Sequence, residues 1–344
     1  MPPIEAARIC LIRTSAVGDV IHTLALVNGL RHGYPEAHLT WIIHPLGHEV
    51  VRHQPGVDRF IVIPRHGRLA PWRQLARELR GERFDLLLLP QVSIKAGLMS
   101  ALVRAPIRLG FDLARSREGH FLFVNRHLPA REPRHVQDQY LEFLDALGIT
   151  GYPVEWNLTF TAEELAWRRE FFAGLVRPVI AFVAASSNPE KDWPAAAQAE
   201  AMEQVARLGH VPLLAGGASE RERQLAAEIV RRCRVEVVVG LEPSIRRTLL
   251  QLSGAAVVVA PDTGPLHAAV AMGVPTVGLY GASDPRRCGP YRFKDLLIDH
   301  FAEPGETLGR IRRVKRRGRM AGITPADVIE KIELALQRYP RTPH

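Results

Sequence analysis

Short, continuous apolar runs alternate with helix-like stretches along almost the whole chain. Runs such as Val179–Ala184 and Ala256–Ala260 consist of β-branched and other apolar residues. Continuous hydrophobicity of this kind is typical of strands that are buried on both faces, as in parallel sheets. Strands that alternate with helices predict an α/β fold with right-handed crossovers. The predicted strands are Arg8–Ile12, Leu39–Ile43, Phe60–Ile63, Phe84–Leu89, Val179–Ala184, Val211–Leu214, Val235–Val239, Ala256–Ala260, Pro275–Leu279 and Leu296–Ile298.

The alternation is interrupted near the middle of the chain. Residues 110–135 carry many charges and little periodicity, and a new strand begins after Val176-Arg177-Pro178. A length of 344 residues suits two domains. We therefore expect two doubly wound domains, residues 1–175 and 176–324, that face a cleft, with a helix in 325–344 packed back on the first domain. In such folds, ligands bind at the carboxyl ends of the strands.

The composition restricts the partners and the compartment. The net charge of +9 favours an anionic partner such as a nucleotide, a phospholipid or a phosphorylated glycan. The three cysteines are far apart, so neither a disulfide framework nor a zinc site is indicated. The first residues do not resemble a signal peptide, and no apolar run approaches the roughly 18 residues of a membrane-spanning helix. We expect a cytoplasmic protein whose contact with a membrane, if any, is peripheral.

The first strand leads into a turn of small residues. This turn, Arg13-Thr-Ser-Ala-Val-Gly-Asp19, precedes a predicted helix and exposes backbone N–H groups to a ligand. It is neither a Walker loop nor a GxGxxG loop, so NAD binding gains no support. Asp19 fits two roles from its position alone. It is either the N-cap of the helix or a catalytic carboxylate.

Two strand ends in the second half carry polar side chains. One strand leads into Asp262-Thr-Gly-Pro-Leu-His267, where a helix that begins near Pro265 would point N–H groups at a diphosphate. Asp262 would repel a phosphate, so it caps the helix, accepts from a hydroxyl or orients a neighbour. His267 either donates to a phosphate or is a hydrogen-bonded core histidine. Another strand leads into a polar loop with Ser186, Ser187 and Lys191, which carry the groups that a phosphate needs.

Four sequence blocks, taken in the order in which they occur along the chain, resemble glycosyltransferase family 9, the ADP-heptose:lipopolysaccharide heptosyltransferases. The resemblance spans roughly residues 8–300, and the Asp-Thr-Gly-x-x-His block is its most specific part. The segments at Ile94–Leu98 and Arg117–Arg126 look more like the heptosyltransferase I type than the II type. The four blocks are Thr14–Thr23, Lys191–Pro194, Asp262–His267 and Tyr280–Pro285.

The resemblance implies a glycosyltransferase-B fold, an acceptor site in the first domain and an ADP-heptose site in the second. It implies that Asp19 is the catalytic base of an inverting displacement onto the lipopolysaccharide inner core, of the Kdo-lipid A type. The chain has no Asp-x-Asp motif, so we expect no metal ion and no cofactor. The donor-binding residues implied are Ser186, Ser187, Lys191, Glu220, Asp262, Thr263, Gly264 and His267.

Basic residues suit an anionic acceptor. The candidates are Arg65, Arg68, Lys95, Arg115 and Arg117, of which we select Arg65, Lys95 and Arg117 as acceptor-binding residues. The segment Arg310–Arg319 has seven basic residues in ten, which suits the anionic inner leaflet of the inner membrane or, equally, nucleic acid. Two alternatives remain open. One is a family-9 transferase with another donor or glycan acceptor, and the other is a nucleic-acid-binding protein, for which no recognition motif is visible.

Overall fold

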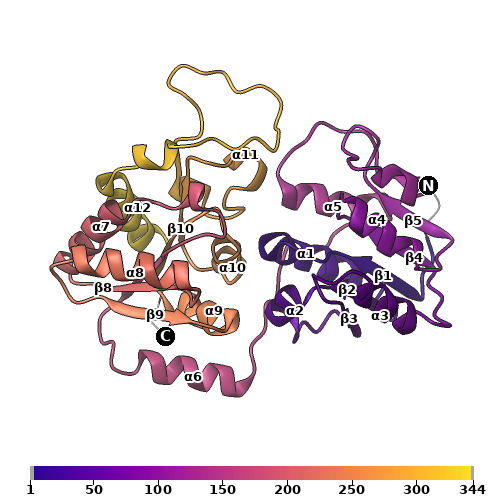
Figure 1. Ribbon diagram of the computed structural model, residues 1–344, viewed down its shortest axis with the longest axis horizontal. Helices are drawn as coiled ribbons and strands as arrows, with labels where there is room; N and C mark the ends of the chain where they lie inside the picture. Colours follow the sequence, from indigo (N-terminus) through magenta and orange to yellow (C-terminus); the bar gives the residue numbers. More distant parts are fainter. Residues whose placement is uncertain (1–3, 342–344) are drawn as a thin grey trace. The chain divides into compact units, whose positions relative to one another are not determined.

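The computed structural model describes residues 4–341 and divides into two compact units (Figure 1). Unit 1 comprises residues 1–159, and unit 2 comprises residues 160–344. Residues 1–3 and 342–344, at the ends of the predicted segments 1–175 and 325–344, lie outside the described part of the chain.

Unit 1 contains a parallel six-stranded sheet with the order β3-β2-β1-β4-β5-β6. Its strands are β1 (Arg8–Ile12), β2 (His38–Ile43), β3 (Arg59–Val62), β4 (Leu86–Leu89), β5 (Ile107–Gly110) and β6 (Arg126–His127). Its helices are α1 (Val17–Gly33), α2 (Pro45–Val51), α3 (Ala70–Glu78), α4 (Ile94–Ala101), the 3-10 helix η1 (His120–Phe123) and α5 (Val136–Ala146).

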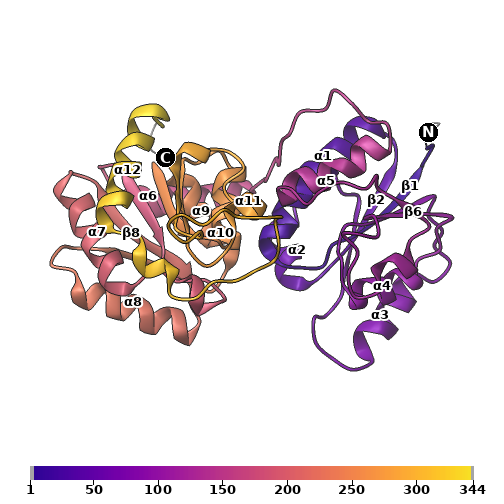
Figure 2. The same ribbon diagram turned by 90° about the horizontal axis from the view of Figure 1, so that it is seen from above.

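Helices cover both faces of this sheet, which explains why its central strands β1 and β4 are almost continuously apolar. Helices α1 and α5 pack together on one side, and α3 and α4 lie on the other (Figure 2). Leu87 and Leu89 of β4 join Leu75 of α3 and Met99 of α4 in one buried cluster. Burial of these side chains is the main force that holds the layers together.

Unit 2 contains a second parallel six-stranded sheet with the order β12-β11-β10-β7-β8-β9. Its strands are β7 (Val179–Val183), β8 (Val211–Gly217), β9 (Val238–Glu242), β10 (Val257–Pro261), β11 (Thr276–Tyr280) and β12 (Leu297–Asp299). Its α-helices are α6 (Ala162–Phe172), α7 (Ala195–Arg207), α8 (Glu220–Arg232), α9 (Ile245–Gly254), α10 (Gly264–Ala271), α11 (Pro285–Cys288) and α12 (Pro325–Arg338). Its 3-10 helices are η2 (Pro189–Lys191), η3 (Lys294–Leu296) and η4 (Arg319–Gly322).

Both sheets reverse their strand order at the same relative place. The chain builds outward from β1 in one direction and then returns to build outward from β4, and it does the same at β7 and β10. Ligands of doubly wound sheets bind at this switch point, beyond the carboxyl ends of the two central strands. The predicted α/β class is confirmed, and the switch points identify where a site is expected in each unit.

The division between the units lies after Thr159 rather than near residue 175. Helix α6 packs against α9 of unit 2 (Figure 1), and the buried guanidinium of Arg246 pairs with Glu164 at 2.6 Å. At the other end of α6, the ring of Phe172 lies against Gly254, where a Cβ would come within 2.4 Å of it. These contacts are long-range, so the composition change near residue 175 did not indicate them.

Helix α12 also differs from the expectation that it would pack on the first domain. It packs on α7, β10 and β11 of unit 2, and buries Val328, Ile332 and Ala335 there (Figure 1). This apolar face is spaced for a helix, but its spacing did not indicate which sheet it would cover. Within residues 4–341, no helix combines the length and the apolar character needed to cross a membrane.

The Arg246–Glu164 pair yields a stability prediction. Glu164→Ala should lower the free energy of unfolding of unit 2 by about 3 kcal/mol, because it leaves a buried guanidinium without its carboxylate. Urea denaturation of the full chain, followed by far-UV circular dichroism, measures the loss. The matched control is Glu163→Ala, the exposed neighbour in the same helical turn. Equal losses in the two variants would contradict the assignment of α6 to unit 2.

Candidate active site

The switch point of unit 2 brings three of the predicted donor residues into contact, namely Lys191, Asp262 and His267. Strand β7 leads into the loop that ends in η2 with Lys191, and β10 leads into Asp262 and α10. Because β7 and β10 are neighbours in the sheet, the two segments meet beyond the strand ends. The ammonium of Lys191 lies 2.6 Å from Oδ2 of Asp262 and 3.1 Å from its carbonyl oxygen.

Asp262 is buried and binds several groups. Its Oδ1 lies 3.2 Å from Nε2 of His267, and the Cys288 thiol lies 3.5 Å from its Oδ2. Burial alone would raise the pKa of Asp262, but the hydrogen bond from His267 and the charge of Lys191 outweigh it and hold that pKa well below its ordinary value. The carboxylate is therefore ionised. Of its three predicted roles, helix capping is excluded because Thr263 is the N-cap of α10, and its contacts with Lys191 and His267 are those of a residue that orients its neighbours.

Helix α10 begins beside this cluster. Thr263 is the N-cap, and its hydroxyl accepts from the backbone N–H of Leu266 at 3.3 Å. Gly264 is the first residue of the helix, and Pro265 follows as predicted for a residue that cannot donate a backbone hydrogen bond. Pro265 has no N–H, and the N–H groups of Leu266 and His267 bond to Thr263, so the N–H of Gly264 and the ammonium of Lys191 form the positively polarised edge that suits an anion. His267 lies one turn in and is buried.

The two predicted serines behave differently. Ser187 is exposed, whereas Ser186 is buried, and its hydroxyl donates to the carbonyl of Asn188 at 2.6 Å. That bond shapes the loop before Lys191 rather than presenting the Ser186 hydroxyl to a ligand. The structure thus places both serines in the loop that carries Lys191, with Ser187 the more accessible of the two.

Arg221 and Asp192 form a clamp on this loop that sequence reasoning missed. The carboxylate of Asp192 accepts from the N–H of Ser186 at 2.7 Å and pairs with the guanidinium of Arg221. Arg221 also donates to the carbonyl oxygen of Ser186. The guanidinium comes from the first turn of α8, so it ties the loop after β7 to the loop after β8. No local sequence signal indicates a contact between residues so far apart.

Glu220 lies in the first turn of α8 and is largely exposed. Gln224 donates to its carboxylate at 2.8 Å, and Arg223 lies 3.7 Å away. The neighbouring Glu222 has a structural task, because it accepts from the N–H groups of Gly217 and Ser219 in a capping box. Glu220 is therefore the more accessible of the two carboxylates at the end of β8.

Asp19 occupies the switch point of unit 1. Helix α1 begins at Val17 with Ala16 as its N-cap, so Asp19 lies in the first turn and is not the capping residue. Its carboxylate pairs with the buried guanidinium of Arg13, and the hydroxyl of Tyr140 donates to it at 3.3 Å. The side chain remains 22% exposed. The geometry holds a carboxylate at the strand ends, in reach of solvent.

The basic candidates of unit 1 separate into two groups. Arg65 and Arg117 are exposed, and Lys95 in α4 donates to the carbonyl oxygen of Arg65 at 2.6 Å. Arg115 is instead buried, and its guanidinium pairs with Asp112 and, at 2.8 Å, with Glu142. The interpretation of Arg115 as an acceptor-binding candidate was wrong, because its guanidinium is buried between Asp112, three residues earlier, and Glu142, which is distant in the sequence.

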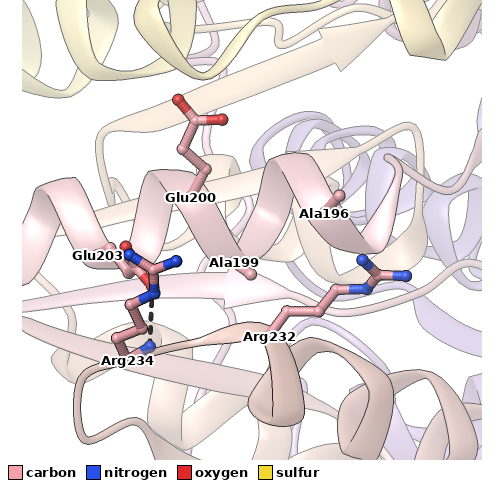
Figure 3. A pocket seen from close by; sticks show the side chains of 6 residues that line it. All are labelled: Ala196, Ala199, Glu200, Glu203, Arg232 and Arg234. Carbon is pink, nitrogen blue, oxygen red and sulfur yellow. Dashed lines mark hydrogen bonds between the residues drawn. The ribbon is translucent and has the colours of Figure 1, made fainter.

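Two further features lie outside this constellation. Among residues 4–341, no group of three or more histidine, cysteine, aspartate or glutamate side chains is placed to hold a metal ion. A pocket of about 360 Å³ opens beside α7, where Arg234 donates its N–H to Glu203 at 2.8 Å (Figure 3). Its lining contains none of the predicted site residues; it consists of Ala196, Ala199, Glu200, Glu203, Arg232 and Arg234.

Comparison with known sequences yields a family profile and full-length relatives. The profile of glycosyltransferase family 9 (heptosyltransferase) matches residues 72–309. The chain is 27% identical over 341 residues to the lipopolysaccharide core heptosyltransferase OpsX of Haemophilus influenzae, over 94% of this chain and 96% of that protein. It is 28% identical over 300 residues to lipopolysaccharide heptosyltransferase 1 of Pseudomonas aeruginosa, over 83% of this chain and 81% of that protein.

Solved structures share the architecture. A family 9 glycosyl transferase from Veillonella parvula has a TM-score of 0.84 at 24% identity, over 96% of this chain and 98% of that chain. The Escherichia coli ADP-heptose heptosyltransferase II has a TM-score of 0.76 at 21% identity, over 97% and 100% of the two chains. The profile match covers more than half of this chain, which therefore belongs to glycosyltransferase family 9 (heptosyltransferase) and is a glycosyltransferase with the glycosyltransferase-B fold of two Rossmann-like units.

Proposed function

We propose that this enzyme transfers a heptose from ADP-heptose to the lipopolysaccharide inner core, with inversion at the anomeric carbon and without a metal ion. The observation that carries the proposal is the contact of Lys191 and His267 with Asp262 beside the N-terminus of α10. Family membership and the heptosyltransferase relatives support it. A structural neighbour, the E. coli heptosyltransferase WaaC, was solved with ADP-2-deoxy-2-fluoro heptose.

Unit 2 supplies the donor site in this proposal. The diphosphate lies against the first turn of α10, where the backbone N–H of Gly264 donates to it and the Lys191 ammonium neutralises its charge. An ammonium has three N–H donors, and Asp262 engages two of them, so one remains for a phosphate oxygen. The approach to the diphosphate site is lined by Thr263, Gly264 and the exposed Ser187. Ser186 shapes the loop before Lys191, and the carboxylate of Glu220 accepts a hydrogen bond from a ribose hydroxyl. These fixed donors act in place of a metal ion on the leaving diphosphate.

Asp19 of unit 1 supplies the base. The acceptor hydroxyl attacks the anomeric carbon, its oxygen forms the new glycosidic bond, and its proton passes to the Asp19 carboxylate. The bond between that carbon and the β-phosphate oxygen breaks, and ADP departs with the electron pair. Arg13 and Tyr140 hold the carboxylate in place. The basic side chains Arg65, Lys95 and Arg117 bind the anionic acceptor, and the reaction takes place at the inner face of the inner membrane.

An alternative is a different glycan acceptor within the same chemistry. The relatives include E. coli lipopolysaccharide heptosyltransferases 2 and 3, at 24% and 21% identity, so the family contains several heptose additions. A nucleic-acid role for the run Arg310–Arg319 is less well supported. Arg316 pairs with Glu306, Arg319 lies 2.8 Å from Glu303, and Arg317 lies 3.7 Å from Glu190, so part of its charge is used within the chain.

The assignment of the base yields a direct prediction. Asp19→Asn should lower the rate of heptose transfer at least about 100-fold, because the amide cannot take the hydroxyl proton. Its affinity for ADP should stay unchanged, since the donor site lies in unit 2. The transfer rate is measured as the release of ADP. The buffer contains EDTA, because the proposed reaction needs no metal ion. Asp145→Asn, a half-exposed carboxylate near the end of α5, is the control. Retained turnover in Asp19→Asn would rule this base out.

The clamp yields a second prediction. Arg221→Met should raise the KM for ADP-heptose about tenfold and leave kcat within about twofold, because the loop with Lys191 loses its charge-assisted bonds while the chemistry is intact. Arg231→Met changes an exposed arginine in the last turn of the same helix and serves as the control. An unchanged KM, or a loss confined to kcat, would show that Arg221 does not position the donor loop.

A further inference from the structure

Helix α4 exposes an apolar face. Ile94, Leu98 and Leu102 are four residues apart, so they follow one side of the helix and its C-cap. Phe121 and Leu122 of η1 are exposed as well, and the five side chains are between 38% and 72% exposed. We call these five residues the α4 platform. Large apolar side chains that gather on a surface mark an interaction site more often than a single exposed leucine does.

The α4 platform is held as one piece. A Cβ at Gly97 would lie 2.3 Å from the ring of Phe123, so only glycine lets η1 pack this closely on α4. The guanidinium of Arg108 then joins the two segments. It donates to the carbonyl oxygens of Ser100 and Phe123, each at 2.8 Å. The apolar side chains are therefore presented by a supported surface rather than by loose loops.

The charges around the α4 platform are mostly positive. Lys95 lies within α4, Arg104 follows Leu102 by two residues and is exposed, and Arg117 precedes η1 and is exposed. The acid next to the platform, Glu118, accepts from the N–H of Ile94 at 3.0 Å, at the N-terminus of the helix. An apolar face rimmed by lysine and arginine matches an anionic lipid surface, into which apolar side chains insert while the cations meet the headgroups.

We propose that the α4 platform is the surface by which unit 1 docks on a bilayer that contains anionic lipids. This inference rests on the proposed function, because a lipid-anchored acceptor would be met at the membrane. Two of the proposed acceptor-binding residues, Lys95 and Arg117, lie at the rim of the platform, so docking there brings the acceptor headgroup to the side chains that would bind it. The platform, rather than the segment Arg310–Arg319, is the primary contact, because that segment has one exposed large apolar side chain, Val314.

The test is co-sedimentation of the full chain with lipid vesicles. The wild type should bind vesicles that contain phosphatidylglycerol and bind those of phosphatidylcholine alone much more weakly. Leu98→Ser/Leu102→Ser should lower the affinity for the anionic vesicles by about tenfold or more, because two apolar side chains no longer insert. Both leucines are exposed, so the fold is expected to be retained, and far-UV circular dichroism checks it.

Two matched variants complete the design. Leu208→Ser/Val230→Ser replaces two side chains of similar exposure in unit 2, and it should leave binding unchanged. Arg312→Ser/Arg313→Ser changes the basic segment and should lower binding by less than the platform variant does. Unchanged binding in Leu98→Ser/Leu102→Ser would overturn the proposal. So would a larger loss in the basic-segment variant, or a wild type that binds no vesicles and forms dimers through α4.

The outcome is independent of the proposed chemistry. Leu98→Ser/Leu102→Ser should keep its transfer rate on a deacylated, water-soluble acceptor within about twofold, since no bilayer is involved. If the wild type fails to transfer heptose but the vesicle results hold, the proposed function fails and the docking surface stands. If transfer occurs and the platform variant binds vesicles like the wild type, the docking surface fails alone.

Discussion

The buried carboxylate of Asp262 constrains where the charged and polar side chains around it lie in unit 2. A buried charge is costly unless partners compensate it, and here the partners are the Lys191 ammonium and the His267 imidazole. Lys191 comes from the loop after β7, and His267 comes from α10 after β10, so the charge balance fixes two segments of the switch point against each other. A cation held in this way is already in place when an anion arrives, which is how fixed donors stabilise a leaving group.

Much of the fold follows from the sequence, because the signals that specify it are local. The run Arg8–Ile12 coincides with β1, and the polar residues after β7 and β10 meet because parallel neighbours end at one edge of a sheet. Strands β5 and β6 were not predicted. They lie in or near the charged segment 110–135. Strand β5 has only four residues and contains Arg108, and β6, at the edge of the sheet, has only two exposed residues, so neither produces a continuous apolar run.

The features that sequence reasoning missed depend on contacts between distant residues. From the sequence alone, Arg115 resembles a surface cation and Arg221 resembles an ordinary helix residue. Only the fold places Glu142 beside Arg115 and Asp192 beside Arg221. The assignment of α6 and α12 to unit 2 depends on which apolar surface each helix finds. Helix α4 spans Ile94–Ala101, and only its packing shows that Leu98 and Leu102 are exposed.

The most direct test of this account is a crystal structure of the chain with bound ADP-heptose or a non-transferable analogue. The account predicts that the diphosphate lies against the first turn of α10, within hydrogen-bond distance of the Lys191 ammonium, which is about 3 Å. It also predicts that Lys191 keeps its contact with Asp262. A diphosphate bound elsewhere, for example beside α7 in the pocket of Figure 3, would contradict the central claim.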